Sequence, residues 1–95
     1  MYHLQVLTPE QIFFDDDIIS LIAPGKQGYL GVLTNHAPLL TSLKTGILII
    51  TDKNNKKSYY NISTGFLEVS HNKASIIIES IEPTDPVDIG TQGGI

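Results

Sequence analysis

Residues 24–46, PGKQGYLGVLTNHAPLLTSLKTG, decide the fold of this chain. The stretch holds four glycines, two prolines and one histidine, with short apolar pieces between them. Glycine is favoured where the backbone takes a positive φ or approaches another segment closely, and proline ends strands. The pattern therefore predicts tight turns and short strands, with an exposed polar loop at residues 34–38.

The N-terminal part of the chain reads as strands as well. Residues 2–7 alternate between apolar and polar side chains, which predicts a half-buried strand that ends at Thr8-Pro9. A short apolar piece at residues 11–14 precedes three aspartates, for which we predict a solvated turn at residues 15–17. The near-continuous apolar run at residues 18–23 predicts a strand that is covered on both faces.

Two hairpins are predicted after the opening stretch. One spans residues 46–63 around Asn54-Asn55, and the other spans residues 66–81 around a turn at residues 71–73. Turn signals recur about every eight to twelve residues and no helical period is sustained, which is typical of an all-β sandwich or barrel. We assign residues 1–81 to this domain and residues 82–95, rich in proline and glycine, to an extended or disordered tail.

Length and composition exclude several classes of protein. Ninety-five residues make one domain, and a net charge of −4 argues against a general nucleic-acid binder. Lys53, Lys56 and Lys57 cluster at a predicted hairpin tip, where we read them as solvated rather than as a phosphate site. The chain has no cysteine, which excludes disulfides and thiolate chemistry. With no signal-peptide pattern and no run of about 20 apolar residues, we expect a soluble cytoplasmic protein.

Catalytic patterns are weak throughout the chain. His3, His36 and His71 stand apart, without the spacing of metal ligands, and no serine lies in a nucleophile elbow. We therefore predict no catalytic residue, no metal and no cofactor. A small β domain of this kind works by presenting edges or loops to partners. The leucines at 39, 40 and 43 are then either core residues or part of a docking surface, and the residues alone leave both readings open.

Six collinear segments carry a resemblance to a known family. They are Leu7-Thr8-Pro9-Glu10, Ala23-Pro24-Gly25, Gly28-Tyr29-Leu30-Gly31-Val32-Leu33, Asn35-His36-Ala37-Pro38-Leu39-Leu40-Thr41, Leu43-Lys44-Thr45-Gly46 and Gly65-Phe66-Leu67-Glu68-Val69. In this order they resemble the epsilon subunit of bacterial F-type ATP synthases, which is called delta in mitochondria. The resemblance implies a flattened antiparallel β-sandwich of about ten short strands.

The resemblance also implies a function. Such a subunit is a non-catalytic part of the central stalk that binds the gamma subunit and the c-ring of the Fo sector, so that proton translocation is coupled to ATP synthesis. It implies a peripheral position in the F1 sector at the cytoplasmic face of the bacterial inner membrane, with membrane association only through the complex. The implied ring contacts are Gln27, Gly28, Tyr29, Leu30 and Gly31, and the implied gamma contacts are His36, Ala37, Pro38, Leu39 and Leu40.

Two departures from the family pattern accompany the resemblance. Tyr29 stands where members commonly carry a glutamate, so an aromatic ring with a hydroxyl replaces a carboxylate. No helical period follows Glu82, so we expect neither the C-terminal helical hairpin of the family nor its nucleotide site and inhibitory role. The alternative function is a free-standing β-sandwich that binds a ligand or peptide. A small metal enzyme of cupin type is disfavoured by the isolated histidines.

Overall fold

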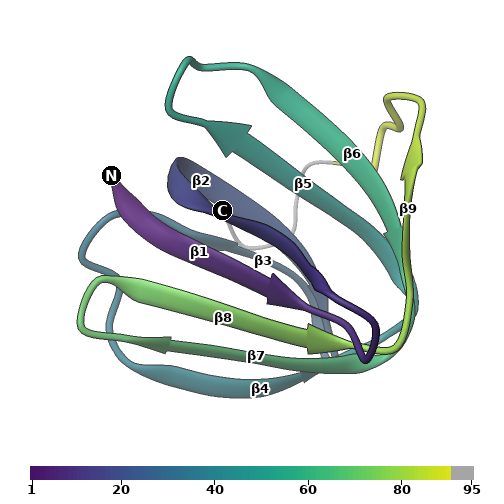
Figure 1. Ribbon diagram of the computed structural model, residues 1–95, viewed down its shortest axis with the longest axis horizontal. Helices are drawn as coiled ribbons and strands as arrows, with labels where there is room; N and C mark the ends of the chain where they lie inside the picture. Colours follow the sequence, from purple (N-terminus) through teal and green to yellow (C-terminus); the bar gives the residue numbers. More distant parts are fainter. Residues whose placement is uncertain (91–95) are drawn as a thin grey trace.

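A computed structural model describes residues 1–90, which form nine β-strands and no helix (Figure 1). The strands are β1 (Tyr2–Leu7), β2 (Ile12–Gly25), β3 (Gly28–Val32), β4 (Leu39–Leu43), β5 (Gly46–Asp52), β6 (Lys57–Ile62), β7 (Gly65–Ser70), β8 (Lys73–Ile78) and β9 (Ile81–Thr84). The predicted all-β class is confirmed, and the strands near residues 24–46 are short, as the glycines and prolines there predicted.

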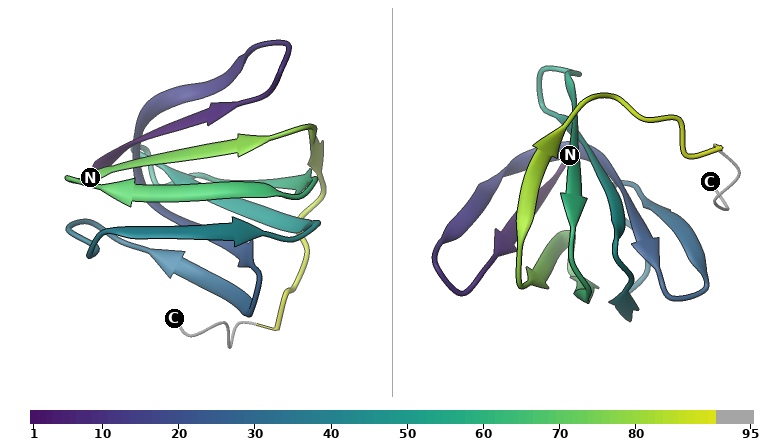
Figure 2. Two further views of the ribbon diagram at one scale, coloured as in Figure 1. Left: turned by 90° about the horizontal axis from the view of Figure 1, so that it is seen from below. Right: turned by 90° about the vertical axis from the view of Figure 1, so that its right-hand side faces the viewer.

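The strands form one continuous sheet that folds over into two layers. Its order is β1-β8-β7-β4-β2-β5-β6-β9, with β3 added to β2 and a further pairing between β1 and β2. Figures 1 and 2 show β8, β7 and β4 side by side in one layer, and β5 with β6 in the other. The long strand β2 joins the layers, because its first half pairs with β1 and its second half with β5 and β3. One pairing, β1 with β8, is parallel, so the sheet is mixed rather than purely antiparallel.

The core lies between the two layers. Strands alternate their side chains between two faces, and in each layer the inward set is aliphatic. The largest fully buried side chains are Leu4, Ile18, Leu21, Leu48, Ile50, Leu67, Ile76, Val6 and Val32. Burial of each such side chain stabilises the fold by about 1.5–3 kcal/mol. Each of the strands β1 to β8 contributes to this cluster, and β9 packs against it through half-buried Ile81.

The predicted turn at residues 15–17 is wrong. β2 runs through all three aspartates, and β1 pairs with them residue by residue, including Gln5 with Asp15 and His3 with Asp17. The acidic side chains stay in solvent, while the backbone groups are satisfied by the ladder. The sequence signal was misleading because charged side chains are compatible with a strand whose face points to water.

The strand predicted to be covered on both faces also differs from the structure. Ile18, Leu21 and Ala23 are buried, but Ile19 is 36% exposed and Ser20 and Ile22 are half-buried. A mixed sheet that closes around its own core leaves its outer face to solvent. This part of β2 is therefore amphipathic, as expected for a sheet with one face in water.

Both predicted hairpins are confirmed. β5 pairs with β6 through a turn in which Asn55 has φ 64°, and β7 pairs with β8 through His71 and Asn72 at φ 52° and 59°. Asparagine tolerates this left-handed conformation better than most residues. β9 pairs with β6, so the sheet extends to Thr84, three residues beyond the predicted boundary. Residues 85–90 have no regular secondary structure, and the rest of the predicted tail lies outside the described residues.

A histidine links the acidic part of β2 to β1. His3 Nε2 lies 2.5 Å from Asp15 Oδ1 and His3 Nδ1 lies 2.9 Å from Asp17 Oδ1, so protonated His3 donates to both carboxylates. The two carboxylates raise the pKa of His3 above its ordinary value of 6.5. Asp16 accepts from the Asp17 amide at 2.7 Å and from Lys53 Nζ at 3.3 Å. These two contacts, the amide first, lower the pKa of Asp16.

We expect the free energy of unfolding to fall as the pH rises above neutrality. A raised pKa means that folded His3 holds its proton more tightly than unfolded His3 does, so its stabilisation is complete below pH 6.5 and is lost above it. The effect is small because the His3 side chain is 40% exposed to solvent. In addition, Lys73 is the partner of His3 in the β1–β8 pair, and its positive charge disfavours protonation of His3. Urea unfolding between pH 5.5 and 8.5 measures it. The His3→Gln variant should have a flatter profile, and identical slopes in the two proteins would contradict the expectation.

Candidate functional site

One of the two segments predicted to contact partners, residues 27–31, lines a cavity between β3 and β4, and the other, residues 36–40, precedes the lining residue Thr41 in the chain. Residues 27–31 form the end of a turn and most of β3, and residues 36–40 form the loop after β3 and the start of β4. The β2–β3 turn is tight, because Gly25 pairs with Gly28 across only Lys26 and Gln27. Gly28 has φ 128°, a conformation that L side chains rarely adopt, so glycine is required there.

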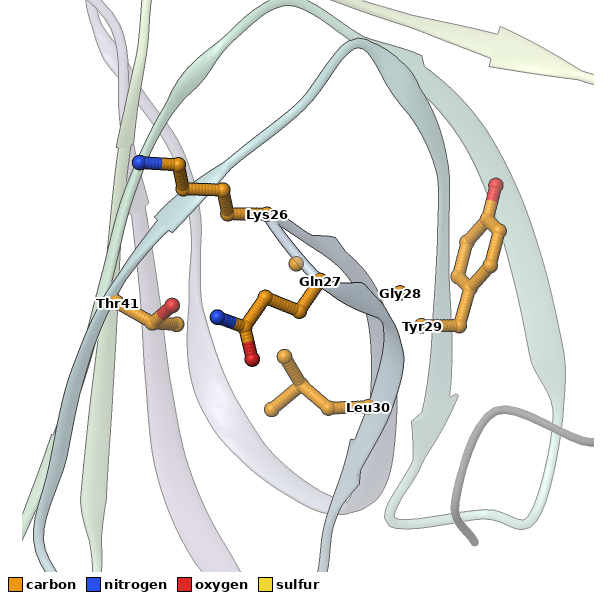
Figure 3. Close-up of a pocket in the computed structure, with 7 residues that line it drawn as sticks. Lys26, Gln27, Gly28, Tyr29, Leu30 and Thr41 are labelled. Carbon is orange, nitrogen blue, oxygen red and sulfur yellow. The ribbon is translucent and has the colours of Figure 1, made fainter.

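The cavity has a volume of about 420 Å³ and is open to solvent. It is lined by Gly25, Lys26, Gln27, Gly28, Tyr29, Leu30 and Thr41. In Figure 3 the side chains of Gln27, Leu30 and Thr41 point into the space between the two strands, while Tyr29 points away from it. This split follows from the strand itself, because neighbouring residues of β3 face opposite sides. Within residues 1–90, β3 pairs with β2 alone, and β4 meets β2 only at the pair Gly25 with Leu43.

Tyr29 is held within the protein rather than aimed at the cavity. Its hydroxyl accepts a hydrogen bond from the backbone amide of Ile47, 3.1 Å away, and its side chain is half-buried. A Cβ at Gly46 would lie 3.0 Å from this hydroxyl and 2.8 Å from the Cβ of Pro24. Because Gly46 at the start of β5 has no side chain, the Tyr29 ring has room to lie between β3 and β5. Tyr29, where the resemblance implied a glutamate, therefore has a structural partner in this chain.

The loop between β3 and β4 is tied to two distant parts of the chain. Asn72, in the β7–β8 turn, accepts a hydrogen bond from the Asn35 amide at 3.0 Å and donates one to the Met1 carbonyl at 3.0 Å. Within the loop, the His36 amide donates to the Leu33 carbonyl at 3.1 Å. The Nδ1 of His36 lies 2.7 Å from the Ala37 carbonyl, which selects the tautomer with a proton on Nδ1. The loop therefore has a defined shape although most of its side chains are exposed.

Tyr2 anchors the C-terminal end of β3. It is 2% exposed, and its hydroxyl donates to the Val32 carbonyl at 2.6 Å. Burial raises the pKa of Tyr2, so the hydroxyl stays protonated and remains a donor. The loop that begins after Val32 thus starts from a rigid point in the core.

The structure separates the leucines whose role the sequence left open. Leu43 is buried, Leu39 is half-buried against the core, and Leu40 is 74% exposed on the outer face of β4. Leu43 and Leu39 are therefore core or core-packed residues, whereas Leu40 belongs to the surface. Leu40 has the side chain that is available to a partner.

Two further exposed apolar residues beside Leu40 were not predicted. Phe66 and Ile77 are 58% and 56% exposed, and they pair with each other across β7 and β8. Leu40 pairs with Glu68 and is therefore a diagonal neighbour of Phe66, within reach of an aromatic side chain. A signal was present in the sequence, because Phe66 alternates in phase with Glu68 and Ser70, which places it on the polar outer face.

The described residues offer surfaces rather than reactive groups. Among residues 1–90, no three histidine, aspartate or glutamate side chains are grouped so that they could hold a metal ion. No helix in the same range is long and apolar enough to cross a membrane. The arrangement can present strand edges, a shaped loop and apolar side chains to another protein.

Comparison with known proteins identifies relatives of this chain. Residues 1–84 match the family described as "ATP synthase, Delta/Epsilon chain, beta-sandwich domain". The "ATP synthase epsilon chain" of Protochlamydia amoebophila is 43% identical over 89 residues, which cover 94% of this chain and 60% of that protein. The protein of the same name from Chlorobaculum tepidum is 40% identical over 80 residues, or 84% of this chain and 91% of that one. The chain thus spans less than two thirds of the first relative and most of the second.

Two solved assemblies contain chains of the same fold. One is from the Euglena gracilis mitochondrial ATP synthase, described as OSCP/F1/c-ring, with a TM-score of 0.81 and 24% identity. The matched region covers 90% of this chain and 54% of the Euglena chain. The second is from the central stalk and c-ring of the Tetrahymena thermophila mitochondrial ATP synthase, with a TM-score of 0.74, 17% identity and coverage of 95% and 75%. At these identities the likeness establishes the fold.

Proposed function

Because this chain belongs to the family of the ATP synthase delta/epsilon β-sandwich domain, we propose that it is a non-catalytic subunit of the central stalk of an F-type ATP synthase. In this role it binds the gamma subunit and the c-ring, turns with them, and helps to couple proton translocation to ATP synthesis. It lies in the F1 sector at the cytoplasmic face of a bacterial inner membrane and is attached there through the complex. No nucleotide site is expected in this chain.

The observation that carries the proposal is the family match, which includes both segments predicted to contact partners. The family identity comes from residues 1–84, and both segments lie within that range. The turn at Lys26 and Gln27 projects from the end of the β2–β3 hairpin, with glycines at 25 and 28 that let another backbone approach closely. We assign Gln27, Gly28, Tyr29, Leu30 and Gly31 to the ring side.

We assign the other segment, His36, Ala37, Pro38, Leu39 and Leu40, to the gamma side. The hydrogen bond from the Asn35 amide to Asn72 and the anchor at Tyr2 hold this loop in one shape before a partner binds, which lowers the entropy cost of binding. Leu40 supplies an exposed apolar side chain, and Phe66 and Ile77 extend the apolar surface beside it. Apolar and aromatic side chains of this kind form the centres of protein interfaces.

We expect the double substitution His36→Ala with Leu40→Asp to weaken gamma binding by at least about tenfold. In the proposed complex Leu40 would be buried against gamma. Loss of that contact and placement of a charge in the desolvated interface each cost about 1–2 kcal/mol of binding free energy. Isothermal titration of purified gamma with the chain measures the change. Leu40 is 74% exposed in the free chain, so its substitution removes little packing, but the new carboxylate lies opposite Glu68 and should lower the thermal unfolding midpoint slightly.

The matched control is Asn61→Asp, which adds the same charge at an exposed position of β6 in the other layer. It should bind gamma like the unmodified chain. Unchanged gamma affinity of a folded double variant would remove residues 36–40 from the interface. A monomeric chain with no affinity for gamma or the c-ring would favour the free-standing ligand-binding or peptide-binding module instead.

A further inference from the structure

We propose that Asn72 is a positioning residue, which holds the loop between β3 and β4 in the shape that a partner recognises. The side-chain amide of Asn72 lies between this loop and the start of β1 and is bonded to both. The inference rests on the proposed function for the identity of the partner, the gamma subunit. It deepens that function by naming a residue outside the predicted contact segments that controls the shape of one of them.

Three segments that are far apart in the sequence meet at Asn72. Figure 1 shows the start of β1, the β7–β8 turn and the loop between β3 and β4 at the same end of the molecule. The Asn72 carbonyl accepts from the His3 amide at 3.4 Å, and its side-chain Nδ2 donates to the Met1 carbonyl at 3.0 Å. The side-chain Oδ1 accepts from the Asn35 amide at 3.0 Å. Asn72 thus connects the N-terminal strand to the loop.

The loop, residues 33–38, has little else to hold it. Its residues are exposed except His36, which is half-buried. Within residues 1–90, the bond from the Asn35 amide to Asn72 is the single hydrogen bond that joins the loop to another part of the chain. The other hydrogen bonds of the loop, both made by His36, stay inside it. A segment with so few buried contacts opens readily, so this one bond governs how long the loop keeps its shape.

The amino-acid type at position 72 supports this role. Ser70 pairs with Lys73, so the turn between β7 and β8 has two residues, His71 and Asn72, and both have positive φ. Glycine is favoured at the second position of such a turn, and asparagine is less favourable there. Of the residues that tolerate positive φ, glycine has no side chain and an ionised aspartate has no donor. Only asparagine offers the donor and the acceptor that the two bonds of this side chain need.

The two bonds depend on each other. The Asn35 amide needs an acceptor and the Met1 carbonyl needs a donor, so a rotation of the Asn72 amide by half a turn would lose both bonds. The bond to Met1 therefore keeps Oδ1 turned toward Asn35. A carboxylate at position 72 needs no such orientation for Asn35, because both of its oxygens accept.

Amide hydrogen exchange of the isolated chain tests the role of Asn72 without a partner. In Asn72→Gly we expect the Asn35 amide to exchange at least about tenfold faster, because it loses its acceptor while glycine keeps the turn. The His36 amide should exchange faster as well, since opening of the loop separates it from the Leu33 carbonyl. Asn72→Asp keeps an acceptor, so the Asn35 rate should stay within about threefold of the unmodified chain.

Asn55→Gly is the matched control. Asn55 also has positive φ, 64°, in the β5–β6 turn, and within residues 1–90 its side chain makes no hydrogen bond. It should leave the Asn35 and His36 amides unchanged. Glycine suits positive φ in both turns, so the unfolding midpoints of the two glycine variants should lie within about 4 °C of each other.

Isothermal titration with purified gamma tests the consequence for binding. When only a fraction of the free chain has the binding shape, the apparent affinity falls by that fraction. We expect Asn72→Gly to bind gamma about fivefold more weakly than Asn55→Gly does. Asn72→Asp should restore most of the affinity, because it restores the bond to Asn35. A role in folding alone would not produce this rescue at equal unfolding midpoints.

The outcomes separate this inference from the proposed function. If the Asn35 amide exchanges equally fast in Asn72→Gly and in the unmodified chain, Asn72 does not position the loop, and the proposed function stands. Faster exchange with the gamma affinity of the control would also overturn the inference, because the loop shape then has no effect on binding. Weaker binding of both Asn72 variants with unchanged exchange would make Asn72 a contact residue instead. A chain that does not bind gamma in any form rejects the proposed function, while the exchange rates still decide whether Asn72 holds the loop.

Discussion

The Gly65→Ala substitution is expected to lower the free energy of unfolding by about 3 kcal/mol. Gly65 begins β7 and pairs with Ile78 on one side and with Leu43 on the other. A Cβ at this position would overlap the backbone carbonyl oxygen of Ile77 and would lie 2.6 Å from Cγ2 of Ile78. Because the first of these atoms belongs to the backbone, a whole strand has to move to make room.

Such a movement disturbs the layer that contains β4 and the candidate gamma segment. A domain of this size has a total stability of roughly 5–10 kcal/mol, so the loss leaves it close to unfolding at physiological temperature. Urea unfolding followed by circular dichroism measures the change. Glu68→Ala, on the exposed face of the same strand, is the control and should stay within about 0.5 kcal/mol of the unmodified chain. A Gly65→Ala protein equal in stability to this control would show that β7 and β8 can separate without cost.

Tyr2→Ala is expected to cost about 4 kcal/mol, the amount typical of removing a large aromatic side chain from a core. Tyr2→Phe should cost only about 1–2 kcal/mol, because the ring remains and the Val32 carbonyl loses its donor. The difference between the two variants separates the packing of the ring from the hydrogen bond. Urea unfolding of both variants under the same conditions gives the two values.

The same pair of variants also tests whether Tyr2 positions the β3–β4 loop. In Tyr2→Phe, the end of β3 loses its anchor, so the His36 amide should exchange faster with solvent than in the unmodified chain. The stability that the neutral hydroxyl contributes is complete below pH 10, the ordinary pKa, and declines as the pH rises further. Unaltered exchange at His36 would confine the role of Tyr2 to the core.

The local structure of most strands could be predicted from residues close together in the chain. Asn54-Asn55 and the turn at residues 71–73 predicted both hairpins, because a turn that needs φ > 0 is encoded by the few residues that tolerate it. The aspartates at residues 15–17 misled the prediction. Their environment is set by His3 and Lys53, which lie far away in the sequence.

The candidate site was only partly predictable, because it too depends on contacts between segments that lie far apart in the sequence. The glycines and prolines predicted turns and an exposed loop at residues 34–38, and the family resemblance implied the contact segments 27–31 and 36–40. That residues 27–30 line a cavity together with Thr41 depends on how β3 and β4 each meet β2, which no local stretch of the sequence shows. Phe66 and Ile77 were read as parts of apolar strands, and their exposure depends on which face the closed sheet turns to solvent.

By itself, the sequence determined the all-β class, the two hairpins, the glycine-dependent turns and the family. These properties depend on backbone conformations and side-chain periods within a few residues. The tertiary structure alone decided that the Tyr29 hydroxyl bonds to the Ile47 amide, that the Tyr2 hydroxyl bonds to the Val32 carbonyl, and that β3 is added to β2. Each of these depends on which segments meet across the sheet. That meeting is set by the packing of the whole core and not by any local stretch.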